Sequence, residues 1–265
     1  MRTIRKRWAP EIFSRWLRER ESVPTDASYD PYVELQGKEK SAVLEALLNE
    51  QEGLCAYCMG PIDIERGTIS IEHYVPRSPN AQGLERERGK RHALDWKNFL
   101  GVCSGYTPIR GRRVEHCDKR RGDKEITLRP ADRLIPSNTH YSINLKKNEL
   151  RRYEVEPLIR YEHKGKMCID AEAAGRAGIT EEEMRELQMQ IDDVLNLNHD
   201  FLKLHRQGVW DSVRAQLEKC TKSGEKYSTK DIEEILSRLQ SLDKDGRRRE
   251  YTMAAIWWLK RRLSR

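Results

Sequence analysis

The stretch GLCAYCMGPI at residues 53–62 decides how the surrounding chain is expected to fold. Its cysteines, Cys55 and Cys58, form a CxxC pair that follows a helical pattern and precedes Gly60-Pro61. A redox pair of the thioredoxin type needs a strand before it and a helix after it, so this pair indicates a metal-binding knuckle. The sequence starts without the apolar stretch of an export signal, which predicts a reducing cytoplasm where thiols stay free to bind metal.

Two further cysteines complete a set of four. A structural zinc site is tetrahedral and usually takes its ligands from two short loops, and Cys103 and Cys117 can supply the second loop. They stand further apart than a CxxC pair, so the basic stretch GYTPIRGRRVE between them must bulge out as a loop. The alternative of ordinary buried thiols at both positions stays open, because cysteine is among the most buried residue types.

Acidic and histidine side chains lie between these cysteines in the sequence. We expect TISIEHY at residues 68–74 to be the second strand of a hairpin, with Glu72 and His73 on opposite sides of it. Asp118 follows the last cysteine in a short predicted helix. Mg²⁺ prefers carboxylates, waters and a phosphate, which suits Glu72 and Asp118, while a neutral His73 can take a proton from water. Zinc would staple the helix against the strand and keep this site rigid.

Four segments, taken in order, resemble the HNH endonucleases, whose core is a ββα-metal fold. They are CAYC at 55–58, IEHYVP at 71–76, DWKNFLGVC at 95–103 and HCDKRRG at 116–122. The resemblance implies that His73 is the general base, that Glu72 and Asp118 hold catalytic Mg²⁺ or Mn²⁺, and that Asn98 braces the loop bearing the histidine. It also implies structural zinc on the four cysteines. Arg121 stands where many members have a lysine and is expected to contact phosphate.

The chain departs from the family pattern in two respects. Asp118 occupies a position that is commonly His or Asn, and the intervals on either side of Asn98 are long for the family. His116 directly precedes Cys117, and it can replace a thiolate at zinc, lie near the substrate or serve a structural role.

The same motifs, together with LNLNHDFLKLHR at 195–206, are similar to those of the PtuB group of HNH nucleases. These are the nuclease subunits of Septu and retron-linked antiphage defence. The similarity implies a hetero-oligomer with a PtuA-like ATPase of the ATP-binding cassette and SMC type. Trp257 and Trp258 face about 100° apart on a helix, which favours a contact surface for a partner in the C-terminal region.

The chain is basic, with 50 lysines and arginines against 43 acidic residues and a net charge of +7. Basic runs at the two ends are well explained as solvated surface. A second group of cations flanks the proposed metal and is expected to bind the phosphate backbone of nucleic acid without reading its sequence. This group comprises Arg110, Arg112, Arg113, Lys119, Arg120 and Lys124. No apolar run approaches the ~20 residues of a membrane-spanning helix, so we expect no membrane segment.

We expect an α+β, mostly helical fold in three parts. These are an N-terminal helical segment and linker (1–50), a nuclease core with a zinc knuckle (51–130), and a hairpin followed by C-terminal helices that dock a partner (131–265). Residues 21–37 lack periodicity and are interpreted as a linker, and DWKNFLGVC as a short helix or turn. EPLIRYEHKGKMCID is predicted to be a hairpin that turns at Lys164-Gly165. Apolar spacing predicts a short helix from Pro10, and helices over 38–51 with Gly53 as C-cap, 180–195, 198–220, 228–241 and 250–263.

These observations predict a metal-dependent HNH endonuclease that acts as the effector of an antiphage complex. The alternative is a non-catalytic zinc-knuckle protein that binds nucleic acid or another subunit. Glu72 and Asp118 separate the two hypotheses, because carboxylates beside a basic groove repel phosphate and serve no purpose in a simple binding module. The sequence leaves open whether the substrate is DNA or RNA.

Overall fold

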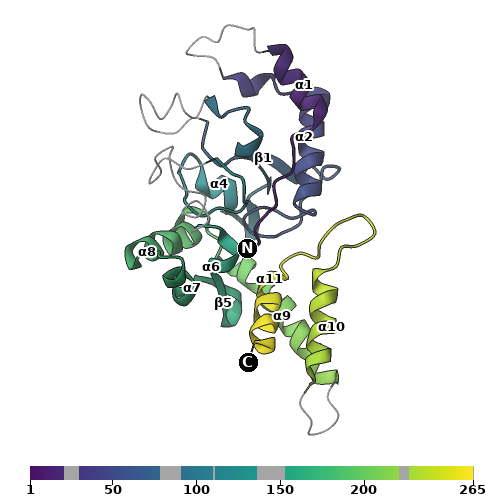
Figure 1. Ribbon diagram of the computed structural model, residues 1–265, viewed down its shortest axis with the longest axis vertical. Helices are drawn as coiled ribbons and strands as arrows, with labels where there is room; N and C mark the ends of the chain where they lie inside the picture. Colours follow the sequence, from purple (N-terminus) through teal and green to yellow (C-terminus); the bar gives the residue numbers. More distant parts are fainter. Residues whose placement is uncertain (21–29, 78–90, 110, 136–152, 221–226, 265) are drawn as a thin grey trace.

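The computed structural model describes residues 1–20, 30–77, 91–109, 111–135, 153–220 and 227–264 (Figure 1). In this part of the chain, helices surround three separate two-stranded antiparallel sheets, which confirms the predicted α+β class. The first helices, α1 (Glu11–Arg20) and α2 (Gly37–Glu50), lie at one end of the molecule. The last helices, α10 (Thr229–Gln240) and α11 (Met253–Leu263), lie at the other end, with the predicted nuclease region between them.

Helix α2 buries the apolar face that its spacing predicts, formed by Val43, Leu47 and Leu48. Gly53 helps to end it, because its N–H donates to Leu48 O at 2.9 Å from a backbone with a φ of 77°. Glycine adopts such a φ without strain. The helix predicted over 38–51 is therefore confirmed, as is the short helix after Pro10, which is α1.

The linker interpretation of residues 21–37 is wrong where the structure describes it. Pro31–Glu34 forms the 3-10 helix η1, and the following Leu35 is fully buried. Tyr32 and Leu35 pack against residues of α1 and α2, whereas Val33 is exposed. The segment shows no periodicity because so short a helix makes barely one turn. Residues 21–29 lie outside the described part of the chain.

The central sheet pairs strands that are far apart in the sequence. β1 (Ile69–His73) runs antiparallel to β2 (Phe99–Cys103), with His73 opposite Phe99 and Ile69 opposite Cys103. The predicted local hairpin ending in TISIEHY is therefore wrong, since the partner strand comes later. The interpretation of DWKNFLGVC as a helix or turn holds only for the 3-10 helix η2 (Trp96–Asn98), after which the apolar run is a buried strand.

The basic stretch between Cys103 and Cys117 is an ordered hairpin rather than a loop. β3 (Tyr106–Ile109) pairs with β4 (Arg112–Glu115), and α4 (Cys117–Arg121) follows as the predicted short helix. The hairpin begins after Cys103 and ends before Cys117. It therefore brings together two cysteines that are distant in sequence.

The C-terminal part follows the predicted pattern closely. β5 (Ile159–Glu162) and β6 (Lys166–Ile169) form the hairpin that turns at Lys164-Gly165, where φ is 65° and 70°. A Cβ at Gly165 would collide with Lys203 O, so only glycine fits against α9. The helices of this part are α6 (Val155–Leu158), α7 (Ala171–Arg176), α8 (Glu181–Met189) with its π-helical continuation Gln190–Val194, α9 (Asp200–Cys220), α10 and α11.

One hydrophobic core extends from Met1 to Leu259 and includes the cysteine knuckle and the C-terminal helices. A smaller core joins Phe13 of α1 to Phe99 of β2. All three predicted parts of the chain contribute to the larger core, and their limits at residues 50 and 130 stay a prediction. None of the helices in the described ranges is long and apolar enough to cross a membrane.

Candidate functional site

The four predicted cysteine ligands meet at one point. Their sulfur atoms all lie within 4.8 Å of one another, with Cys55 Sγ 3.9 Å from Cys117 Sγ and Cys58 Sγ 3.8 Å from Cys103 Sγ. A tetrahedron with Zn–S bonds of about 2.3 Å has sulfur–sulfur edges of about 3.8 Å, whereas a disulfide holds its sulfurs about 2 Å apart. The cluster can therefore hold a structural metal such as zinc, and the alternative of unrelated buried thiols is wrong.

The electrostatics of the cluster call for a cation. Hydrogen bonding to Cys103 raises the pKa of the Cys58 thiol, and burial raises the pKa of Cys117. Hydrogen bonds from Cys117, Cys55 and Cys58 hold the pKa of Cys103 far below its usual range. Without a cation, these effects thus favour the thiol form of Cys58 and Cys117 and the thiolate form of Cys103. A bound dication removes the repulsion among thiolates, so that all four can ionise and act as ligands.

The knuckle is shaped by its own backbone. Cys55 N–H donates to Gly60 O at 2.8 Å, and Gly60 N–H donates to Cys58 Sγ at 3.3 Å. The hydroxyl of Tyr251 lies so close to Gly60 that a Cβ would collide with it. In addition, Tyr251 N–H donates to Met59 O at 3.1 Å, which ties the knuckle to the start of α11.

His116 stands beside the sulfur cluster and hydrogen-bonds to it. Its Nδ1 is 3.2 Å from Cys117 Sγ, and its Nε2 is 3.1 Å from Thr107 Oγ1. Its ring stacks on that of His199, with the centroids 5.1 Å apart. With four sulfurs already converging, these contacts favour the structural role among the three alternatives for His116.

Glu72, His73 and Asp118 line one cavity of about 260 Å³. The first two end β1, and Asp118 lies in the first turn of α4, directly after the ligand Cys117. Asp118 is within hydrogen-bonding reach of Glu72. The structure therefore brings together the three side chains that the sequence singled out for chemistry, and the sulfur cluster fixes the helix that carries one of them.

Glu72 is buried and tightly held. Its Oε1 accepts a hydrogen bond from Tyr57 Oη at 2.9 Å and pairs with Arg121, while its Oε2 accepts His73 N–H at 3.1 Å. Burial raises the pKa of Glu72, and the nearby Asp118 raises it further. These two effects outweigh the positive charge of Arg121, which lowers it, so that the pKa of Glu72 is about 8. A buried carboxyl whose ionisation is opposed by burial and by a neighbouring carboxylate is stabilised in its charged form by a hard divalent cation, which binds oxygen. Carboxylates are the donors that Mg²⁺ or Mn²⁺ prefers, and a site for either ion at Glu72 and Asp118 stays a prediction.

The expectation that Arg121 contacts phosphate is wrong. Arg121 is 1% exposed, and its guanidinium donates to Tyr57 Oη at 3.1 Å, His73 O at 3.1 Å and Tyr74 O at 2.6 Å, besides pairing with Glu72. Its Nε donates to Lys124 O at 2.8 Å. These acceptors enclose the charge completely, so Arg121 positions Glu72 and the end of β1 instead of facing solvent.

His73 is held as a neutral imidazole of defined tautomer. Its Nε2 lies 2.9 Å from Ala93 O, and because a carbonyl only accepts, this nitrogen carries the proton. Burial lowers the pKa of His73 to about 3. Nδ1 therefore carries the lone pair. The ring is fixed edge-on against Tyr32 and Phe99, with centroid distances of 4.6 and 5.1 Å.

Asn98 joins the loop after His73 to β2. It is fully buried; its Oδ1 accepts Val75 N–H at 2.6 Å, and its Nδ2 donates to Val75 O and to His92 O, both at 3.0 Å. These are the contacts of a residue that braces the chain on both sides of the His73 loop. Its predicted part in catalysis stays a prediction.

The predicted nucleic-acid-binding cations are spread over two elements. Arg112 and Arg113 are exposed on β4, and Lys119 lines the cavity. Arg120 and Lys124 are also exposed, with Arg120 Nε donating to Asp193 O at 3.2 Å. Arg110 lies outside the described residues. A phosphate contact by this group stays a prediction.

Three residues around the site were not anticipated. Tyr57 holds Glu72, Tyr32 packs on His73, and Arg77 lines the cavity with its guanidinium 4.3 Å from the centre of the Tyr32 ring. The sequence could have pointed to two of them, because Tyr57 lies inside the CxxC motif and Arg77 directly follows IEHYVP. No pattern in the sequence points to Tyr32, since it comes from a segment without periodicity.

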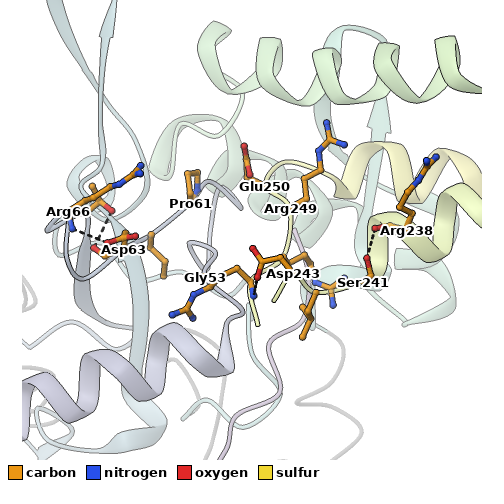
Figure 2. A pocket seen from close by; sticks show the side chains of 14 residues that line it. Gly53, Pro61, Asp63, Arg66, Arg238, Ser241, Asp243, Arg249 and Glu250 are labelled. Atoms are coloured by element: carbon orange, nitrogen blue, oxygen red, sulfur yellow. Dashed lines mark hydrogen bonds between the residues drawn. The ribbon is translucent and has the colours of Figure 1, made fainter. Parts of the chain in front are cut away.

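A second pocket, of about 540 Å³, lies between the knuckle loop and the turn before α11 (Figure 2). Arginines line it, but Figure 2 shows Arg66 and Arg238 on opposite sides, with Asp243 and Glu250 between them. None of the side chains predicted for chemistry lines this pocket, and its charges do not converge.

Comparison with known protein families finds no matching family model, and comparison with curated proteins finds no significant match.

Proposed function

We propose that the chain is a metal-dependent endonuclease that hydrolyses phosphodiester bonds of nucleic acid. The observation that supports this proposal is the placement of a neutral, oriented His73 in one cavity with Glu72 and Asp118. A simple binding module would gain nothing from two carboxylates where phosphate must lie. The four-cysteine cluster supports the proposal further, because it anchors both α4, through Cys117, and β2, through Cys103.

In this proposal His73 is the general base. Its Nδ1 accepts a proton from a water molecule whose oxygen attacks the phosphorus, and the bond from phosphorus to the leaving oxygen breaks. The leaving oxygen takes a proton from solvent, and His73 later returns its proton to solvent. Mg²⁺ or Mn²⁺ held by Glu72 and Asp118 would supply positive charge to the phosphate. Tyr57 and Arg121 keep Glu72 in place, and Ala93 O keeps Nδ1 free to accept.

We further propose that the nuclease is the effector of an antiphage complex with an ATPase partner, on the strength of the motif similarity. Trp257 and Trp258 are half-buried against Trp210, with ring centroids 6.4 and 5.9 Å away. Arg261 and Arg262 lie over their rings. A partner that docks here would meet arginines lying on indoles, which suits an acidic surface.

The decisive experiment compares His73→Ala with His163→Ala, a histidine exposed on the β5–β6 turn. Each protein is incubated with plasmid, single-stranded DNA and tRNA plus Mg²⁺, with and without a PtuA-like ATPase. We expect His73→Ala to lose cleavage while keeping its zinc content and a cooperative unfolding transition above the assay temperature, and His163→Ala to cut like the wild type. Cleavage retained by His73→Ala would refute the mechanism. A wild type that binds these nucleic acids but never cuts them would favour the binding module.

A further inference from the structure

Arg121 is not the cationic side chain that meets the scissile phosphate in the proposed nuclease site. Its guanidinium is enclosed by acceptors within the protein. Among the described residues that line the cavity, the cations are Arg77 and Lys119, against the carboxylates of Glu72, Asp118 and Asp123. Among the described residues, these two side chains are the ones that can add to the charge of the metal when a phosphate enters this acidic cavity.

Arg77 is held in place while part of its guanidinium stays available. It lies over the ring of Tyr32 at 4.3 Å, its Nη1 pairs with Asp30, and its side chain is 32% exposed. Within the described part of the chain, Nε and Nη2 have no hydrogen-bond acceptor. A guanidinium presents a planar fork of donors that matches two phosphate oxygens, so the unused edge of Arg77 is suited to bind one.

Asp30 sets this arrangement with its two carboxylate oxygens. Oδ1 accepts Tyr32 N–H at 3.0 Å and caps η1, while Oδ2 pairs with Arg77. Tyr32 in turn stands edge-on to His73 at 4.6 Å. Arg77, Tyr32 and His73 therefore form one continuous layer, which fixes the guanidinium relative to the proposed general base.

Lys119 lacks such support. It is exposed at the cavity, and no described carboxylate lies within ion-pair distance of it. An ammonium on a flexible stem is strongly hydrated and must be ordered at the moment of reaction, whereas a stacked and paired guanidinium is already oriented. The geometry therefore favours Arg77 over Lys119 as the residue that meets the reacting group.

We propose that Arg77 contacts the scissile phosphate, and that Asp30 and Tyr32 are the positioning residues that hold it there. The inference rests on the proposed nuclease function. It makes the segment from Asp30 to Leu35, expected to be a linker, part of the site. The removal of one preorganised charge at a transition state lowers a rate by about 10²–10³-fold.

The test compares Arg77→Ala, Arg77→Lys, Asp30→Asn and the control Arg66→Ala, an exposed arginine of the pocket in Figure 2. Zinc content and melting temperature establish that each variant is folded. Single-turnover cleavage should fall about 10²–10³-fold in Arg77→Ala, less in Arg77→Lys and Asp30→Asn, and not in Arg66→Ala. Millimolar guanidinium ion should partly restore Arg77→Ala alone, a rescue that a merely structural role would not produce. Cleavage by Arg77→Ala within threefold of wild type would overturn the inference.

A binding measurement separates this inference from the proposed function. Thymidine 3′,5′-bisphosphate is titrated into each protein in the presence of Ca²⁺. We expect Arg77→Ala to bind at least about tenfold more weakly than wild type and Arg66→Ala to bind equally. If the wild type binds the bisphosphate through Arg77 but cuts no nucleic acid, the nuclease proposal fails and the phosphate contact stands. Equal binding by wild type and Arg77→Ala refutes the contact, whether or not the protein cuts.

Discussion

Removal of the Asn98 side chain should destabilise the protein by about 3–5 kcal/mol. Asn98→Ala deletes two buried hydrogen bonds to Val75, at 2.6 and 3.0 Å, and a partly buried one to His92 O at 3.0 Å. Each contributes about 0.5–1.5 kcal/mol net, and the buried N–H and carbonyl of Val75, which lose the Asn98 side chain as partner, add about 1–3 kcal/mol of desolvation penalty. The free energy of unfolding is measured by urea denaturation of the zinc-loaded protein.

Gln51, which follows α2 and contacts the middle of β2, offers a matched control. Its side chain makes three hydrogen bonds, all buried, with Leu54 O at 2.8 Å, Gly101 O at 2.7 Å and Gly101 N–H at 2.7 Å. Gln51→Ala should therefore lower the free energy of unfolding by a similar amount. Only Asn98 borders the His73 loop, so at a temperature where both variants are folded only Asn98→Ala should lose cleavage. A loss in Asn98→Ala below about 1 kcal/mol would refute the hydrogen-bond argument, and equal cleavage by both variants would refute the bracing role.

Two further predictions concern the metal centre and an ion-pair cluster. Cys58→Ser should abolish zinc binding and the cooperative unfolding transition, because structural zinc contributes folding energy. The control is Cys220→Ser, since Cys220 is exposed. Zinc is assayed by its release to a chromogenic chelator. Burial opposes the charge of Glu52, but its ion pairs with Arg248 and Arg2 outweigh burial and hold its pKa below the usual range. The folded state thus binds this proton less readily than the unfolded chain, so the stabilisation is present above about pH 4.5 and lost as pH falls through the folded pKa. Glu52→Gln should flatten the acid side of the stability curve, and an unchanged curve would contradict this.

Local features of the fold were predictable, and long-range pairings were not. The helix ending near Gly53 and the turn at Lys164-Gly165 follow from apolar spacing and from glycine at positive φ, which are properties of adjacent residues. The pairing of β1 with β2 joins segments almost thirty residues apart, and nothing local selects it. The short apolar run FLGVC is ambiguous for the same reason, since such a run suits a buried strand or a helix.

In the candidate site, too, some residues were predictable from the sequence and others were not. Residue type and order placed Glu72, His73, Asp118 and the four cysteines correctly near one another, because thiolates and carboxylates have few other uses in such spacing. Arg121 was misjudged because burial decides whether an arginine faces substrate or supports a neighbour, and the sequence does not reveal burial. Tyr32 comes close to His73 through tertiary packing alone.

The sulfur cluster is also a junction between regions. Cys117 N–H donates to Leu195 O at 2.9 Å, and the knuckle at Met59 accepts Tyr251 N–H at 3.1 Å, so two C-terminal segments are fastened directly to the ligand loops. Oxidation of one of the four cysteines would therefore loosen the proposed nuclease site and, at the same time, the C-terminal helices that are expected to bind a partner.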